Sequence, residues 1–181
     1  VDLVSMQVQY SLLDRRPEGA MADLCARSGM SLLCYGTLAG GLLSEQWLGA
    51  AEPREASENR SHVKYRLIID EFGGWALYQR LLGVLKQIAD KHQSCIPAIA
   101  TRFVLDRPQV AGAIVGARYA DRLSETLAVF DLTLDDSDRA RIDEILRDST
   151  GPTGDVYDLE RDRTGRHGSI MKYNLNQAVG A

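Results

Sequence analysis

The sequence holds 181 residues, of which 45% are hydrophobic, with a formal net charge of −4 and an isoelectric point of about 5.4. This size allows one domain with a core, and the acidic balance argues against a general binder of nucleic acid or anionic membranes. No stretch reaches the apolar length of a membrane span, and the three cysteines form no metal or CxxC pattern. We therefore expect a reduced, cytoplasmic protein without a metal site.

The first third of the chain has the pattern strand, helix, strand. Residues 3–8 and 30–35 are short apolar runs that suit strands. Between them, Pro17 suits a first helical turn and Gly29 a helix stop. Four apolar residues recur at helical spacing between these two signals: Ala20, Met21, Leu24 and Cys25. The connections are short enough to predict a βαβ unit.

The next segment, residues 44–74, is polar, charged and poorly periodic, which predicts a long connection. Four helices are expected beyond it, at residues 76–92, 97–107, 121–130 and 132–146, with a third strand at residues 110–117. Thr133 or Asp135 would cap the last helix, and three residues would face inward: Ile142, Ile145 and Leu146. An irregular polar tail is predicted for residues 148–181.

Alternating strands and helices predict an α/β fold with a parallel sheet covered by helices. Only about three strands are visible, and a parallel sheet buries both of its faces. Three strands make a poor independent sheet of this kind. Either the rest of the sheet is missing or the strand count is too low.

The third strand is followed by residues that suit an anion. Ligands of parallel α/β folds sit at the carboxyl ends of the strands. Gly116 lets the backbone approach a ligand, and Arg118 and Arg122 offer the planar donors that bind phosphate in a bidentate manner. Glu125 lies one turn beyond Arg122. The alternative is a solvated helix face on which Arg122 and Glu125 form an ion pair.

The second strand ends in a similar way. Tyr35 could present its flat face to a ring, and the backbone of the glycine-rich turn after it could approach a ligand. Alternatively, Tyr35 is a core residue and the glycines only shape the turn. Gln7, within the first strand, needs a partner for its amide, which is either a ligand amide or a neighbouring backbone group.

Three blocks of the sequence together resemble one known family. They are "MQVQYSLLDRR", "GMSLLCYGTLAGGLL" and "IADKHQSCIPAIATRFVLDRPQVAGAIVGARYADRLSETLAVFDLTLDDSD". In order and spacing they are similar to the carboxyl-terminal half of the aldo-keto reductases, closest to the branch with potassium-channel beta subunits and many bacterial oxidoreductases. The resemblance implies that residues 1–147 form the carboxyl-terminal portion of a (β/α)8 TIM barrel, which binds NADP at the carboxyl ends of its strands.

The resemblance also assigns roles around the nicotinamide and the pyrophosphate. Gln7 would hold the nicotinamide carboxamide, and Tyr35 would stack on the nicotinamide ring. Four residues would form the turn beside the pyrophosphate: Gly36, Thr37, Leu38 and Gly41. The family commonly has Ser-Pro where this chain has Gly36-Thr37.

At the adenosine end, three residues resemble the phosphate turn: Gly116, Ala117 and Arg118. Arg122 would meet the 2′-phosphate and Glu125 would lie near the adenine amino group. Thr126 takes a position usually held by asparagine, which weakens the adenine contact.

The catalytic set of the family is an aspartate, a tyrosine, a lysine and a histidine in the amino-terminal half, and none of them maps onto this chain. Its tyrosine would act as the general acid toward a carbonyl oxygen. Three histidines are expected at the surface: His62, His92 and His167. Three aromatic residues would either line a substrate pocket or pin the long connection to the barrel: Trp47, Phe72 and Trp75.

We therefore expect the cofactor-binding half of an NADP-dependent oxidoreductase acting on a small carbonyl or alcohol, with the isolated chain inactive. The alternatives are a non-catalytic NADP-binding or regulatory module that docks on a partner protein, and a truncated product without stable function. A half-barrel exposes two sheet edges, so association through them is expected.

Overall fold

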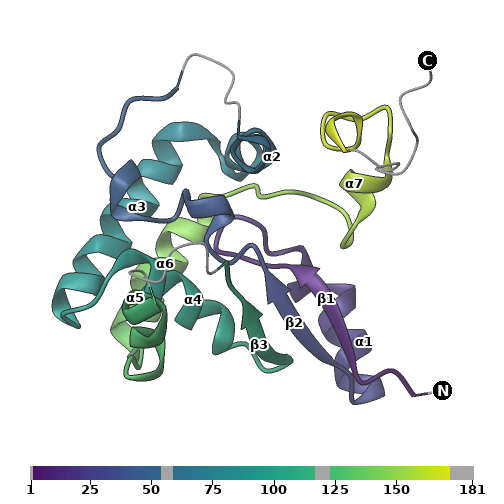
Figure 1. Ribbon diagram of the computed structural model, residues 1–181, viewed down its shortest axis with the longest axis horizontal. Helices are drawn as coiled ribbons and strands as arrows, with labels where there is room; N and C mark the ends of the chain where they lie inside the picture. Colours follow the sequence, from purple (N-terminus) through teal and green to yellow (C-terminus); the bar gives the residue numbers. More distant parts are fainter. Residues whose placement is uncertain (1, 54–58, 117–122, 172–181) are drawn as a thin grey trace.

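The computed structural model describes residues 2–53, 59–116 and 123–171 (Figure 1). Its main elements, in chain order, are β1 (Ser5–Gln9), α1 (Ala20–Ser28), β2 (Ser31–Tyr35), α2 (Arg60–Phe72), α3 (Gly74–Lys91), α4 (Ile96–Leu105), β3 (Val110–Ile114), α5 (Leu123–Leu127), α6 (Asp136–Arg147) and α7 (Asp158–Arg161). Short 3₁₀ turns punctuate the connections between them.

The three strands form one parallel sheet in the order β1-β2-β3, which confirms the predicted α/β arrangement. Gln9 pairs with Tyr35, and Tyr35 pairs with Ile114. The carboxyl ends of the three strands are therefore level with one another at one edge of the sheet. The segments that follow each strand start from this common edge, where parallel α/β folds bind their ligands.

The helix between the first two strands differs in detail from the prediction. Pro17 lies in a separate 3₁₀ turn, Arg16–Glu18, and α1 begins only at Ala20. Gly29 ends α1 with a φ of 71°, the left-handed conformation that glycine adopts readily. Of the four apolar residues with helical spacing, only Cys25 is buried, while Leu24 is 44% exposed.

The prediction of a long connection over residues 44–74 is wrong, because the structure forms α2 there. The side chain of Asn59 caps α2 by accepting a hydrogen bond from the Ser61 backbone N–H at 3.0 Å. Four residues on one side of α2 are buried: Tyr65, Ile68, Ile69 and Phe72. Charged residues between these positions hide a regular helical spacing.

The remaining helices follow the prediction closely. In α3, six residues with helical spacing are buried, namely Leu77, Leu81, Leu82, Leu85, Ile88 and Ala89, and this helix packs against α2, α4 and α6. Asp135 caps α6 in a reciprocal pair with Asp138: each backbone N–H donates to the other's carboxylate, at 2.9 and 3.2 Å. The expected inward residues of α6 are buried.

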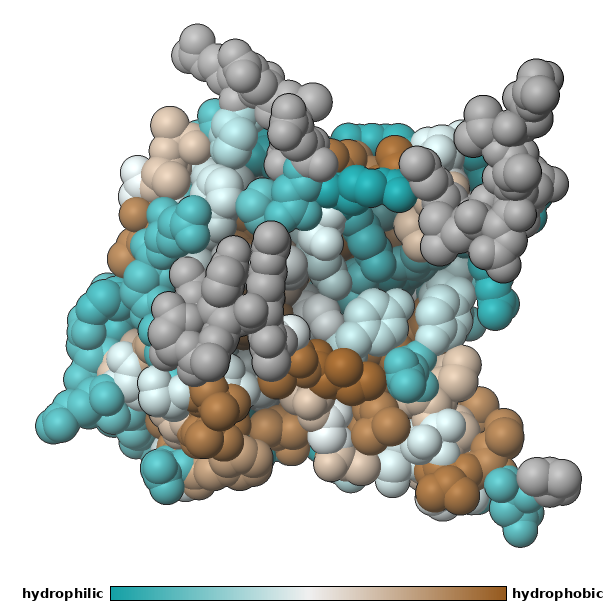
Figure 2. All heavy atoms as spheres, viewed as in Figure 1, coloured by the Kyte–Doolittle hydropathy of each residue, from teal (hydrophilic) through white to brown (hydrophobic). Residues whose placement is uncertain are grey.

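The carboxyl-terminal segment lies beside α2 and the end of β1 (Figure 1, yellow). In its described part it forms α7 and a 3₁₀ turn, Gly168–Ile170. The division of the chain after residue 147 remains a prediction. Figure 2 shows hydrophobic surface mainly over the half of this face that holds the strands and α5. Phe130, 73% exposed, and Val4, 80% exposed, are among the exposed apolar residues.

Candidate functional site

The turn after β2 owes its shape to tight packing against α2. Gly36 has a φ of 70° and Gly40 a φ of 67°. A Cβ atom on Gly36 would lie 2.1 Å from the Tyr65 hydroxyl, and one on Gly40 would lie 2.9 Å from a ring carbon of Tyr65. Only glycine satisfies both demands at these positions, because any side chain would clash as well as strain the backbone.

A groove of about 500 Å³ runs from this turn to the end of β3, and we call it the groove below. It lies in the usual size range of small-molecule sites. Seven of the predicted cofactor residues line it: Gly36, Thr37, Leu38, Gly41, Gly116, Glu125 and Thr126. A Cβ at Gly41 or Gly116 would meet nothing within 4 Å, so the space beside the backbone is open at both ends of the groove.

Three further predicted residues, Ala117, Arg118 and Arg122, lie outside the described residues. The groove also includes residues that sequence reasoning did not single out, namely Leu43, Ser44, Ser61, Tyr65, Pro97, Ile114 and Val115. Ser61 and Tyr65 come from α2, four residues apart on one face. This spacing was the only sequence signal for them, and it lay in a segment interpreted as a connection.

Tyr35, at the end of β2, is half-buried beside the groove rather than part of its lining. The Lys64 Nζ atom of α2 lies 5.6 Å from the centre of the Tyr35 ring and 5.5 Å from that of Tyr65. Burial raises the pKa of Tyr35 to about 12, so its hydroxyl is neutral at physiological pH. Burial also lowers the pKa of Lys64, against the attraction of nearby carboxylates.

The expectation that Gln7 is a buried amide is wrong. Its side chain is exposed, whereas the last two residues of the same strand, Val8 and Gln9, are buried. Its backbone carbonyl accepts a hydrogen bond from the Tyr157 hydroxyl of the carboxyl-terminal segment. The buried glutamine of this strand is instead Gln9, which is 4% exposed.

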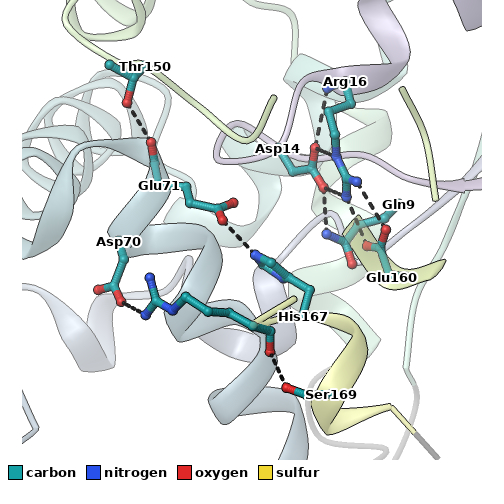
Figure 3. Close-up of polar contacts among 10 residues, drawn as sticks. Gln9, Asp14, Arg16, Asp70, Glu71, Thr150, Glu160, His167 and Ser169 are labelled. Atoms are coloured by element: carbon teal, nitrogen blue, oxygen red, sulfur yellow. Dashed lines mark hydrogen bonds and ion pairs between the residues drawn. The ribbon is translucent and has the colours of Figure 1, made fainter. Parts of the chain in front are cut away.

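Gln9 belongs to a buried polar network that we call the Arg16 cluster, made of Gln9, Asp14, Arg16 and Glu160 (Figure 3). The Arg16 guanidinium donates to both oxygens of Asp14, at 2.7 and 2.9 Å, and to both oxygens of Glu160, at 2.9 and 3.0 Å. Gln9 Nε2 donates to Asp14 at 2.6 Å. All of these side chains are buried, so the cluster ties the segment after β1 to α7.

Electrostatics hold the Arg16 cluster in its ionised form. Burial raises the pKa of Glu160, but the hydrogen bonds and charge of Arg16 outweigh it and leave this pKa below its ordinary value. Burial works against the charge of Arg16 as well, and both carboxylates more than compensate, so the pKa of Arg16 rises. Removal of one partner would therefore leave a buried charge without its counterion.

The surface location predicted for the three histidines is wrong for His167, which is only 4% exposed. Its ring Nε2 pairs with the Glu71 carboxylate of α2 at 2.8 Å (Figure 3). His92 pairs with buried Asp138 at 2.6 Å. His62 lies in α2, not in a loop, with its ring against Trp47.

The aromatic residues expected in the long connection mainly hold it to the helices. Phe72 is fully buried in the core. Trp47 and Trp75 meet edge to face at 6.1 Å, and Trp75 Nε1 donates to the Ala50 carbonyl at 3.1 Å. None of the three lines the groove. Their contacts favour the pinning role over the pocket-wall role.

Cys25 and Cys34 are buried and Cys95 is half-buried, all as free thiols. Burial raises the pKa of Cys34 to about 12. Among the described residues no group of three or more His, Cys, Asp or Glu side chains is placed to hold a metal ion. Within the same residues, every helix is too short or too polar to cross a membrane.

The chain was compared with protein-family models, with curated proteins and with solved structures. The model of the Aldo/keto reductase family matches residues 1–147. The chain is 37% identical over 109 residues to flagellar radial spoke protein 5 of Chlamydomonas reinhardtii, covering 59% of this chain and 20% of that protein. It is 26% identical over 156 residues to the uncharacterized oxidoreductase YrpG of Bacillus subtilis, covering 86% of this chain and 44% of that protein.

The structure of a glycerol dehydrogenase from Gluconobacter oxydans superposes with a TM-score of 0.68 at 24% identity, over 85% of this chain and 46% of that one. The chain thus spans less than half the length of each of these three proteins. The match confirms the predicted fold class, part of a (β/α)8 barrel with three parallel strands. The chain belongs to the aldo/keto reductase family.

Proposed function

We propose that this chain is the cofactor-binding half of an NADP-dependent oxidoreductase that interconverts a small carbonyl compound and its alcohol. The observation that best supports this proposal is the groove. It joins the glycine turn after β2 to the end of β3, which are the two places where the family resemblance expects the pyrophosphate and the adenosine. The catalytic aspartate, tyrosine, lysine and histidine would belong to a preceding segment of a longer protein.

The residues of the groove suit a dinucleotide. Open space beside Gly41 and Gly116 lets an elongated ligand approach the backbone at both ends. Tyr35 would offer its ring to the nicotinamide, and its neutral hydroxyl would not be needed as an acid. Arg122 would hold the 2′-phosphate, a role assigned by the resemblance alone. When bound, the cofactor supplies the hydride, while the protein binds and orients it.

The test uses the full reading frame that contains this chain. Binding of NADPH and NADH is measured by fluorescence titration, and turnover with a panel of aldehydes and ketones. NADPH should bind more tightly, and Arg122→Ala should weaken its binding about ten- to a hundredfold, as expected for a charge-assisted contact, with little change for NADH. The exposed Arg80, which pairs with Asp148, provides the control variant Arg80→Ala.

Equal losses for NADPH and NADH would show that Arg122 is structural. If the full protein binds neither NADPH nor NADH, the proposal as a whole is refuted. The 181-residue chain alone should reduce no carbonyl with NADPH, since it lacks the expected proton donor.

A second function is favoured by one relative. Flagellar radial spoke protein 5 carries a name that describes a part of a flagellum rather than an enzyme. This supports the alternative of a non-catalytic NADP-binding or regulatory module that docks on a partner protein. In that case the full protein would bind NADPH and turn over no member of the carbonyl panel, whereas an oxidoreductase would do both.

A further inference from the structure

Tyr65 has a hydroxyl group that the fold of the described residues leaves without a hydrogen bond. The residue is 6% exposed and lines the groove, and its hydroxyl forms no hydrogen bond with the described residues. The other two most deeply buried tyrosines differ. Tyr10 donates to Glu18 at 2.7 Å, and Tyr78 donates to the Leu42 carbonyl at 2.5 Å. The Tyr65 oxygen is not among the buried side-chain atoms that lack a partner, so it is open to the groove, where a ligand can accept its hydrogen bond.

The location of this hydroxyl points to the class of that ligand. The hydroxyl oxygen lies 2.1 Å from the point where a Cβ atom on Gly36 would be. It therefore fills the space that a side chain would take at the start of the glycine turn. The turn itself supplies backbone and no side-chain donor at Gly36. A ligand lying along the turn would therefore meet the Tyr65 hydroxyl first.

We propose that the Tyr65 hydroxyl donates a hydrogen bond to the nicotinamide-side phosphate of the bound dinucleotide. This inference rests on the proposed function and adds to it a phosphate ligand contributed by α2. Phosphate oxygens are strong acceptors, and a phenol is a neutral donor that needs no counterion. Lys64, whose Nζ lies 5.5 Å from the Tyr65 ring, adds positive charge nearby.

A purely structural role for Tyr65 would require its ring but not its hydroxyl. Its ring packs against Gly40, and it lies under the Lys64 ammonium. Phenylalanine would preserve both contacts, because neither uses the hydroxyl. The variant Tyr65→Phe therefore separates the two roles.

The experiment measures binding to the full protein by calorimetry with three probes. NADPH and 2′-phospho-ADP-ribose both contain the nicotinamide-side phosphate, whereas adenosine 2′,5′-bisphosphate lacks it. Tyr65→Phe should weaken the first two about tenfold or more, as expected for a hydrogen bond to a charged group, and leave the third within about twofold. Tyr78→Phe, which removes a buried hydroxyl that is already paired, should leave all three affinities unchanged.

Unchanged affinity of Tyr65→Phe for NADPH overturns the inference and leaves the proposed function intact. Equal weakening of all three probes also overturns it, because the defect would then be structural. A wild-type protein that binds none of the probes refutes the proposed function, and the inference with it.

A second set of variants tests the geometry through the melting temperature. Gly36→Ala and Gly41→Ala both place a side chain at positive φ, but only the Gly36 variant meets the Tyr65 hydroxyl. Gly36→Ala should therefore lower the melting temperature more, and adding Tyr65→Phe should restore part of the difference. Equal effects of the two single variants would place the hydroxyl elsewhere and contradict the inference.

Discussion

The groove and the Arg16 cluster both follow strands at the same edge of the sheet, but their polar groups are used in opposite ways. In the cluster, Arg16 donates to both oxygens of each of two buried carboxylates. In the groove, the Tyr65 hydroxyl has no partner among the described residues, and the glycine turn leaves open space. In the cluster, Gln9 Oε1 has no partner, but the charged groups are paired with one another and hold chain segments together. A free donor beside open space suits a ligand instead.

The largest effect should come from breaking the cluster. Arg16→Met would leave Asp14 and Glu160 as buried carboxylates without a counterion, which costs about 3–5 kcal/mol. Urea unfolding of the full protein measures this loss. Arg80→Ala serves as control, because Arg80 pairs with Asp148 at 2.9 Å at the surface and should cost less than about 1 kcal/mol. Similar losses for both variants would contradict the structural role of the cluster.

A smaller effect, with a pH signature, is expected for Glu160→Gln. Because the pKa of Glu160 is lowered on folding, its contribution to stability is present above its ordinary pKa of 4.5 and is lost as the pH falls below it. The variant should lose about 2 kcal/mol at pH 7, from weakened charged hydrogen bonds. Its stability should then fall less steeply than that of the wild type between about pH 5 and pH 3. Parallel pH profiles would exclude this carboxylate as the source.

On the side of the groove, substitutions should affect binding more than folding. Tyr35→Ala should weaken NADPH binding by about 1 kcal/mol or more, through the loss of an aromatic face. Tyr35→Phe should retain most of the activity, since stacking does not need the hydroxyl. The measurement is kcat of the phenylalanine variant across pH. A loss of several hundredfold would show that Tyr35 is the acid.

The smallest effect on stability is expected for an exposed ion pair of the carboxyl-terminal segment. Arg166 pairs with Asp70 at 2.9 Å, but its side chain is 63% exposed. Arg166→Ala should change the free energy of unfolding by about 0.5 kcal/mol or less, with a further decrease in high salt. A loss as large as that of Arg16→Met would mean that exposure does not separate the two kinds of ion pair.

Sequence patterns predicted the fold where local periodicity and burial agree. In α6, the Asp135 cap and the inward Ile142 were both recognisable within a few residues. For α2 the information was present but misread: Tyr65, Ile68, Ile69 and Phe72 have helical spacing, and the charges between them suggested a loop. The lesson is that spacing deserves more weight than composition when the two disagree.

The site divides in the same way. The glycine turn is local, so the open backbone after Tyr35 could be anticipated from the residues that form it. The Arg16 cluster could not be predicted, because Arg16 and Glu160 are 144 positions apart in the chain. Gln7 was misjudged for a related reason: whether a strand residue is covered depends on which distant segments pack over it, and within β1 Gln9 is covered while Gln7 is not.

The buried thiol of Cys34 has a practical consequence. It is fully buried in β2, directly before Tyr35, and its raised pKa keeps it protonated and unreactive in the folded state. Alkylation can then occur only when β2 opens, so the labelling rate of Cys34 reports the opening of the strand that carries the glycine turn. The protein thereby contains its own kinetic probe, and a ligand bound along that turn should slow the modification of Cys34.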